Sequence, residues 1–207
     1  PAASLTNVGL AGGVRAYQNM LTKLMSHQLA EMRNLGPRAK EALSAIIPHY
    51  VERAKPSSYL QTVNREMEAL AKKLLWNVKP SKTAESVNLF SAGNRRIRPM
   101  AIAHILYPYS NLSLRDLYHF AETLLPEDCR KIVETYCQHK DVRGNRRNKP
   151  GRGLEFGYPI TFDLIGDFGI YRDLQRHRML TQQRQLLTPY LGYRIPDEVV
   201  DAGLAWK

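Results

Sequence analysis

The spacing of the apolar residues changes near residue 85, and this change limits the folds open to the chain. Before that point apolar residues recur every three or four positions, for example Val63, Met67 and Leu70, as on one face of a helix. After it, short stretches alternate between apolar and polar residues, as strands do. We therefore predict an α/β fold of the α+β type, with a helical portion over residues 1–84 and an α/β portion over 85–207. The polar, proline-containing stretch 79–84 is the predicted linker.

Capping and breaking residues bound the individual elements. Pro37 and Pro126 suit the first turn of a helix, and Ser113 and Asp167 suit N-cap positions. The predicted helices cover residues 14–29, 37–47, 57–76, 96–107, 113–124, 126–139 and 167–180. Strands are predicted over 86–91 and 154–165, paired antiparallel, with helices covering one face of the sheet.

The charge balance favours anionic partners. Thirty Lys and Arg residues stand against 19 Asp and Glu, a formal net charge of +11, while the overall composition is typical of a globular protein. No apolar run approaches the ~18 residues that a membrane span needs, so no membrane partner is predicted. Cys129 and Cys137 are predicted to be reduced, which suits a cytoplasmic location. No Cys/His spacing suggests a metal site.

The densest group of basic residues lies in the segment 171–178. On a helix Arg172 and Arg176 share a face, and His177 and Arg178 extend the positive charge in two other directions. Guanidinium groups held in this way suit a diphosphate, which accepts bidentate hydrogen bonds. Spacing alone slightly favours the alternative of a solvated basic face balanced by nearby aspartates.

A second basic segment covers residues 140–152. Its glycines would let the backbone approach an anion, but neither the Walker nor the dinucleotide glycine motif is present. A phosphate site, a nucleic-acid patch and a solvated loop all remain open for this segment. No catalytic triad, carboxylate pair or redox cysteine pair can be assigned, so the catalytic residues stay unknown.

The segment 161–178, TFDLIGDFGIYRDLQRHR, resembles the flavin-dependent thymidylate synthases, the ThyX family. That family has a strand ending in Thr-Phe and then a helix ending in Arg-His-Arg, with the same separation. The family motif continues with Ser, Asn and Glu, where this chain has Thr181, Gln183 and Arg184, and it departs further beyond them. The resemblance implies cofactor binding by Arg172, Arg176, His177 and Arg178, and substrate binding by Thr181, Gln183 and Arg184.

Residues 1–33 resemble a late segment of the same family. There Asn7, Arg15 and Arg33 are the implied counterparts of nucleotide-contacting residues. A late segment followed by an early one is the order expected for the end of one ThyX copy joined to the start of the next, in a tandem-duplicated protein. The resemblance then implies that the site is completed by homo-oligomer formation or by pairing with a second ThyX-like copy.

The chemistry implied by the resemblance is the methylation of dUMP to dTMP. In the family, reduced FAD delivers a hydride, methylenetetrahydrofolate donates the carbon and NADPH is a cosubstrate. Two alternatives remain open for this chain. It could be a catalytically degenerate ThyX-like scaffold, or a basic nucleic-acid-binding module. The sequence disfavours nucleic acid, because residues 140–152 contain no aromatic side chain on which a base could stack.

Overall fold

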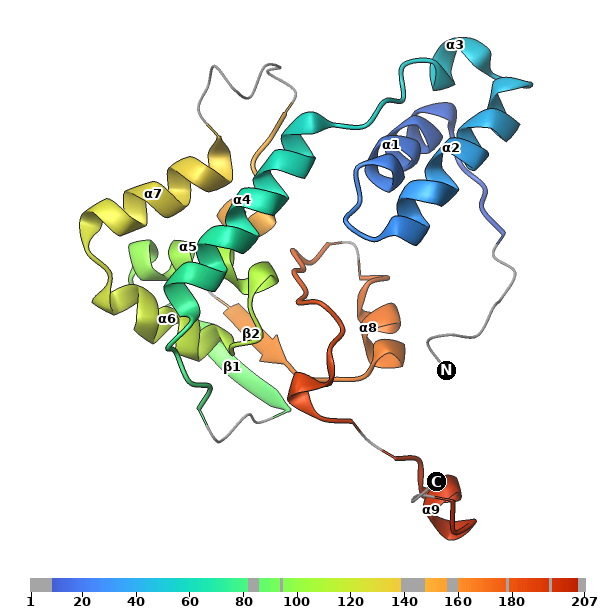
Figure 1. Cartoon of the computed structure of the whole chain (residues 1–207). Coiled ribbons are helices and arrows are strands. Elements are labelled where there is room, and N and C mark those ends of the chain that lie inside the picture. Colours follow the sequence, from blue (N-terminus) through green and yellow to red (C-terminus); the bar gives the residue numbers. More distant parts are fainter. Residues whose placement is uncertain are drawn as a thin grey trace. The chain divides into compact units, whose positions relative to one another are not determined.

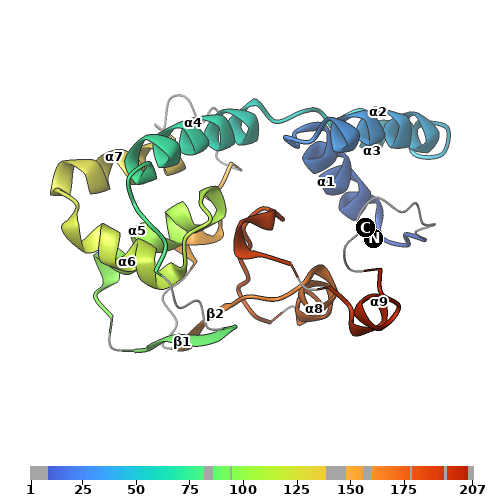
Figure 2. The same cartoon turned by 60° about the horizontal axis from the view of Figure 1, so that its bottom comes forward.

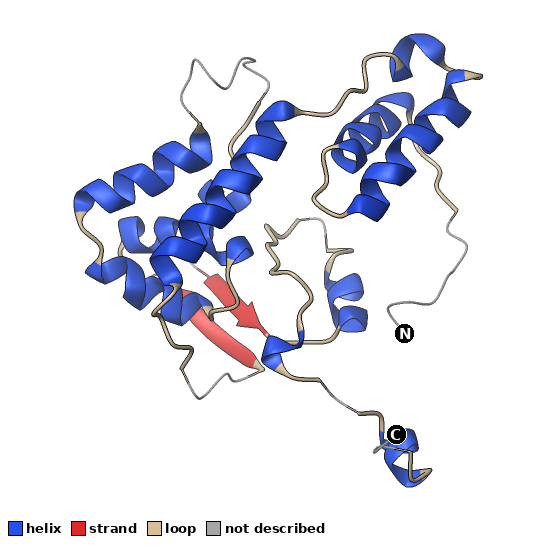
Figure 3. Cartoon of the chain, in the orientation of Figure 1, coloured by secondary structure: helices blue, strands red, loops and turns tan. Residues whose placement is uncertain are grey.

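The structure is a computed structural model that describes residues 9–81, 86–93, 95–138, 148–155, 160–177, 179–193 and 195–204. It combines helices with a two-stranded antiparallel sheet, so the predicted α+β class is confirmed (Figure 3). The chain divides into two compact units, Pro1–Arg65 and Glu66–Lys207. This division falls inside the helix α4 (Ser58–Leu75), whereas the sequence placed the boundary between residues 84 and 85.

The first unit is a small helical assembly. Its elements are α1 (Val14–Met25), α2 (Ala30–Ser44), α3 (Pro48–Val51) and the first part of α4. Leu21 and Met25 of α1 pack with Val51 and Ala54 in its core. The backbone N–H of Ser57 donates to the Ser26 hydroxyl (2.8 Å), which ties the start of α4 to the end of α1. Burial of the α1 stripe therefore organises this unit.

The second helix begins earlier than the sequence predicted. We expected Pro37 to open it, but α2 starts at Ala30 and passes through Pro37. The reason is a local cap, because the Arg33 guanidinium donates to the carbonyls of His27 and Gln28 and so stabilises the turn before the helix. Pro37 then removes one hydrogen bond from inside the helix. Likewise, α1 ends at Met25 rather than near residue 29.

At Gly36 the helix α2 packs closely against the end of α1. A Cβ atom at this position would lie 2.6 Å from Cγ of Met25 and 3.1 Å from its backbone nitrogen. We expect Gly36→Ala to destabilise the first unit by about 1–3 kcal/mol, because overpacking outweighs the helix propensity that alanine adds. Faster amide hydrogen exchange over α1 and α2 would report this. Gly9→Ala, which has open space around it, is the matched control. Unchanged or slower exchange in Gly36→Ala would contradict the prediction.

The second unit contains the sheet. Its helices and strands are β1 (Val87–Ala92), α5 (Ile97–Leu106), α6 (Leu114–Thr123), α7 (Pro126–Cys137), β2 (Ile160–Leu164), α8 (Phe168–Leu174) and α9 (Asp197–Asp201), together with the second part of α4 (Figure 1). Short 3₁₀ turns cover Tyr107–Tyr109, Arg152–Leu154 and Pro189–Leu191. The predicted bounds of α4 to α7 agree within two residues, and both cysteines are free thiols.

The predicted antiparallel pairing of the two strands is confirmed. Val87 pairs with Leu164, and Leu89 pairs with Phe162. The register shifts between Leu89 and Ser91, so that Phe90 and Ser91 both turn inward, as at a β-bulge. The second strand is shorter than predicted, since the 3₁₀ turn Arg152–Leu154 stands where its start was expected. Residues 156–159 lie outside the described part of the chain.

Helices cover the inner face of this sheet. The Phe90 ring meets the His104 ring of α5 and the Tyr118 ring of α6 edge-on, at centroid distances of 6.3 and 5.7 Å. Figure 2 shows α5 and α6 on this side of the strands. The fully buried residues Ile102, Ile105 and Leu117 complete the core between them. Because the core lies on one side, the strands are held by their inward side chains.

Candidate functional site

A buried carboxylate fixes the strand that leads into the candidate site. Asp163 of β2 accepts hydrogen bonds from the Tyr107 hydroxyl (2.8 Å) and from the backbone N–H of Leu114, the first residue of α6 (2.6 Å). Burial, together with the neighbouring carboxylate, raises the pKa of Tyr107. Asp163 thus anchors β2 to the start of α6, where negative charge is also favoured by the helix dipole.

The predicted N-cap of α8 is confirmed. The Asp167 carboxylate accepts from the backbone N–H of Ile170 (2.9 Å). The predicted length is wrong, because α8 ends at Leu174 rather than near Leu180. The chain leaves the helix in a tight turn, and the side-chain amide of Gln182 returns to donate to the carbonyls of Leu174 (2.6 Å) and His177 (3.3 Å). A side chain eight residues away therefore caps this helix.

The last turn of α8 and the turn after it hold three of the four predicted cofactor-binding residues. Arg172 is exposed on the last helical turn, and Arg176 and His177 are exposed just beyond it. The prediction that Arg172 and Arg176 share a helix face is wrong, because the helix stops two residues before Arg176. Nη1 of Arg176 lies 3.6 Å from Oδ1 of Asp173, and both side chains are 75% exposed. Arg178 lies outside the described residues.

Arg184, predicted to bind substrate, lies against the same helix. Its guanidinium carbon is 5.2 Å from the centre of the Tyr171 ring, the geometry of a cation–π contact. The extended segment after the turn thus folds back and adds a further cation to α8. We call Arg172, Arg176, His177 and Arg184 the cationic turn.

The other side of this extended segment contacts the body of the second unit. The Gln185 amide donates to the Leu112 carbonyl (2.7 Å), and the Gln183 side chain lies beside His104 of α5. His104 is 1% exposed, and its burial lowers its pKa to about 4, although the contact with Gln183 offsets part of the shift. Gln183 therefore faces the core rather than an open substrate site, and Thr181 is half-buried.

The three residues of the first unit that were predicted to contact a nucleotide differ in their surroundings. Arg15 is exposed in the first turn of α1. Arg33 instead donates to the carbonyls of the turn between α1 and α2. Asn7 lies outside the described residues. Of the two residues that the structure describes, Arg15 is the one whose side chain is exposed and open to a ligand.

Of the glycines in the segment 140–152 the structure describes Gly151, and this residue and the adjacent Gly153 both serve packing. The Tyr136 hydroxyl accepts from the backbone N–H of Gly153 (3.0 Å). A Cβ at Gly153 would lie 3.0–3.1 Å from backbone atoms of α5, and one at Gly151 would clash with Tyr136. At these two glycines the backbone therefore packs closely against other parts of the protein. Residues 139–147 lie outside the described part of the chain.

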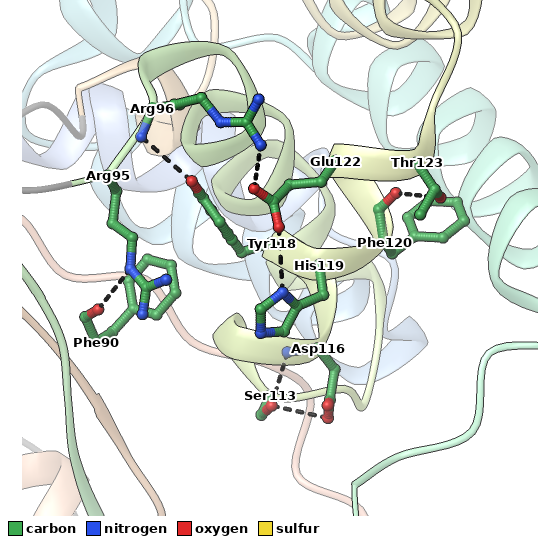
Figure 4. Close-up of polar contacts among 10 residues, drawn as sticks. All are labelled: Phe90, Arg95, Arg96, Ser113, Asp116, Tyr118, His119, Phe120, Glu122 and Thr123. Atoms are coloured by element: carbon green, nitrogen blue, oxygen red, sulfur yellow. Dashed lines mark hydrogen bonds and ion pairs between the residues drawn. The ribbon is translucent and has the colours of Figure 1, made fainter.

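Sequence reasoning missed a network at the start of α5 (Figure 4). Arg95 stacks on the rings of Phe90 and Tyr118, with its guanidinium carbon 5.1 and 5.0 Å from their centres. Arg96 pairs with Glu122, which also contacts Nδ1 of His119 (3.2 Å). Hydrogen bonds from Arg96 and then His119 lower the pKa of Glu122. The basic residues at 95 and 96 were the available signal, but Tyr118 and Glu122 lie 22 and 26 residues from Arg96 in the sequence.

The described residues show neither a metal-binding cluster nor a membrane-spanning helix. Among them no group of three or more His, Cys, Asp or Glu side chains is placed to hold a metal ion. Nor does any helix in the described ranges combine the length and apolar character needed to cross a membrane.

The chain is similar to proteins named UPF0159. It is 41% identical to one from Chlamydia pneumoniae and 38% identical to one from Chlamydia muridarum, each over 97% of this chain. A UPF0159 protein of Thermoplasma acidophilum is 29% identical over 95% of the chain. The chain spans 38% of the length of each of these relatives. No protein-family model matches the chain, and no solved structure matches it.

Proposed function

We propose that the cationic turn binds the phosphate groups of a nucleotide, with FAD as the ligand, in a protein of the flavin-dependent thymidylate synthase type. The observation that carries the proposal is the gathering of Arg172, Arg176, His177 and Arg184 around the end of one short helix. Three of these residues come from the stretch that carries the resemblance to that family. A diphosphate would accept charge-assisted hydrogen bonds from such a group.

The residues present fit the phosphate part of FAD. The Arg172 and Arg176 side chains are exposed, and the carboxylate beside Arg176 is a solvent-exposed partner at 3.6 Å. An exposed pair of this kind contributes little to stability, so a phosphate can compete with Asp173 for Arg176. Asp167 does not compete in this way, since its carboxylate caps α8. The group therefore offers cations without a strongly held counter-ion.

Bound FAD would supply the hydride for the methylation of dUMP to dTMP, with methylenetetrahydrofolate and NADPH as cosubstrates. The part proposed for this chain is narrower. Arg172, Arg176 and His177 hold the cofactor phosphates, and Arg184 is kept beside them by Tyr171. A homo-oligomer or a second ThyX-like copy would supply the rest of the site. No covalent role is assigned to a side chain.

The test is the affinity for FAD, measured by flavin fluorescence at fixed salt. We expect Arg176→Ala to weaken binding roughly ten- to a hundredfold, because charge-assisted hydrogen bonds to the phosphate are lost. Arg176→Lys should recover only part of the affinity, since the planar guanidinium is absent. Arg130→Ala, which removes an exposed arginine of α7, is the matched control for net charge. Equal affinity of Arg176→Ala and the original chain would contradict the proposal.

A second candidate is a ThyX-like scaffold without catalytic activity. It is favoured because two residues that were predicted to bind substrate make contacts within the protein. Gln183 lies beside the buried His104, and Arg33 caps a turn, so both make internal contacts instead of facing a ligand. Measuring FAD binding and dTMP formation on the same preparation separates the two candidates. Binding without dTMP formation supports the scaffold, whereas formation of dTMP supports the enzyme.

A further inference from the structure

Trp76 is exposed at the end of α4, away from the side chains that pack this helix. In the second unit α4 buries Met67 and Ala71, each 0% exposed, and Leu74 continues this stripe half-buried. Trp76 directly follows the last helical residue, Leu75, and its side chain is 78% exposed. Two residues along a helix turn by about 200° around its axis, which places Trp76 on the side opposite Leu74. The indole thus lies outside the core, and aromatic side chains on a surface are enriched where partners bind.

Three exposed lysines flank Trp76 along the chain, namely Lys72, Lys73 and Lys79. Lys72 and Lys73 precede the ring by four and three residues, the spacings at which side chains on a helix become neighbours. Residues 69–84 contain no Asp or Glu, and no described carboxylate forms an ion pair with any of the three lysines. The dipole of α4 favours cations in its last turn, which accounts for Lys72 and Lys73. It accounts neither for Lys79, which lies beyond the helix, nor for the exposed ring.

Trp76 and the three lysines, which we call the lysine–tryptophan cluster, have the chemistry of a site for single-stranded nucleic acid. Proteins that bind such strands without reading their sequence combine cations for the phosphates with aromatic rings for the bases. The bases of a duplex are already stacked on one another, so an indole finds an open base only on a single strand. The segment 140–152 has positive charge but no aromatic side chain, whereas this cluster has both.

A membrane surface fits the same cluster less well. A helix that lies in the membrane interface buries a broad apolar face. Here a single ring stands beside lysines and the exposed Asn77, while Leu74 and Leu75 are half-buried against the protein. Too little apolar surface is therefore presented for insertion between lipids, although one ring is enough to stack on a base.

We propose that the lysine–tryptophan cluster binds single-stranded nucleic acid, with one base stacked on the indole of Trp76 and the adjacent phosphates on the lysines. The net charge of +11 favours the approach of a polyanion. Little preference for base sequence is expected, because every base has a face that can stack. The cluster shares no residue with the cationic turn, so it is independent of the proposed FAD site.

The test is the affinity of the full chain for a fluorescently labelled oligo-dT strand of about 12 nucleotides, measured by anisotropy. We expect Trp76→Leu to weaken binding about five- to a hundredfold, because the stacked base is lost while an apolar side chain remains. Trp76→Phe should keep part of the affinity, since its smaller ring still stacks. Lys72→Gln and Lys79→Gln should each reduce the slope of log affinity against log salt by about 0.7. Lys131→Gln, at an exposed lysine of α7, is the matched control and should leave the slope unchanged.

The fluorescence of the indole gives a second measurement that leaves Trp76 in place. The chain has two tryptophans, so Trp206→Phe leaves Trp76 as the source of the signal. Stacking of a base should quench this fluorescence as the unlabelled strand is added. Circular dichroism shows whether each variant is folded, and the quenching decides the matter if Trp76→Leu is not.

Four results would overturn the proposal. Unchanged affinity in Trp76→Leu would mean that binding rests on net charge alone, and an unquenched indole would exclude stacking. Binding of a duplex that depends equally on Trp76 would exclude the preference for single strands. Displacement of the strand by dTMP at the same nucleotide concentration would assign the cluster to a free nucleotide. Binding to vesicles of phosphatidylcholine and phosphatidylserine that depends on Trp76, with none to the strand, would assign it to a membrane surface.

Discussion

Replacing Asp163 by alanine is expected to lower the free energy of unfolding by about 2–4 kcal/mol, the largest single-residue effect that we predict. The change leaves two donors without their acceptor, the Tyr107 hydroxyl and the backbone N–H of Leu114. Both contacts lie between the sheet and the helical layer, where water cannot easily replace the carboxylate. Chemical denaturation followed by circular dichroism measures the effect.

Two variants show whether the cause is the lost carboxylate. Asp163→Asn keeps one side-chain oxygen, so it should retain one of the two hydrogen bonds and lose roughly half as much stability. Asp173→Ala removes a carboxylate that is 75% exposed, and it should change stability by less than about 0.5 kcal/mol. If Asp163→Ala were as mild as Asp173→Ala, the anchoring role of Asp163 would be wrong.

The second large effect is a loss of stability in mild acid caused by His104. Burial lowers the pKa of this histidine to about 4 in the folded protein, against about 6.5 in the unfolded chain. Between these values the unfolded state binds more protons than the folded state, so the free energy of unfolding falls as the pH drops. The loss begins near pH 6.5, is complete below about pH 4, and amounts to roughly 3 kcal/mol.

Comparing the pH dependence of stability in two proteins isolates this histidine. His104→Gln cannot take up a proton, so its free energy of unfolding should fall less steeply between about pH 6.5 and 4.5 than that of the original chain. The carboxylates titrate in both proteins and cancel in the comparison. Parallel slopes for His104→Gln and the original chain would refute the role of His104.

The site was only partly predictable, since the arginines were visible in the sequence but their surroundings were not. The basic segment Arg176-His177-Arg178 can be recognised from the sequence alone. That Arg176 stands beyond the helix depends on Gln182, which returns to cap the carbonyls of α8. That Gln183 faces His104 depends on where α5 lies. Each of these contacts requires the folded chain, because spacing within one helix does not reveal it.

The sequence by itself determined the elements whose causes lie within a few residues. Ser113 and Asp167 cap their helices through backbone N–H groups three residues ahead, and such contacts can be recognised from local order. The apolar periodicity of α4 and the alternation in β1 are likewise local patterns. Net charge also follows from composition alone, since it needs no geometry.

Only the tertiary structure decided which face of the sheet is buried and what the extended segment after α8 contacts. The hydrogen bond from Leu114 to Asp163 joins residues 49 apart, and that from Gln185 to Leu112 joins residues 73 apart. In β2 the inward position of Asp163, which accepts from Tyr107 and Leu114, leaves the apolar side chains of Ile160, Phe162 and Leu164 on the exposed face, because side chains alternate across a strand. Such contacts between distant groups exist only once the chain has folded.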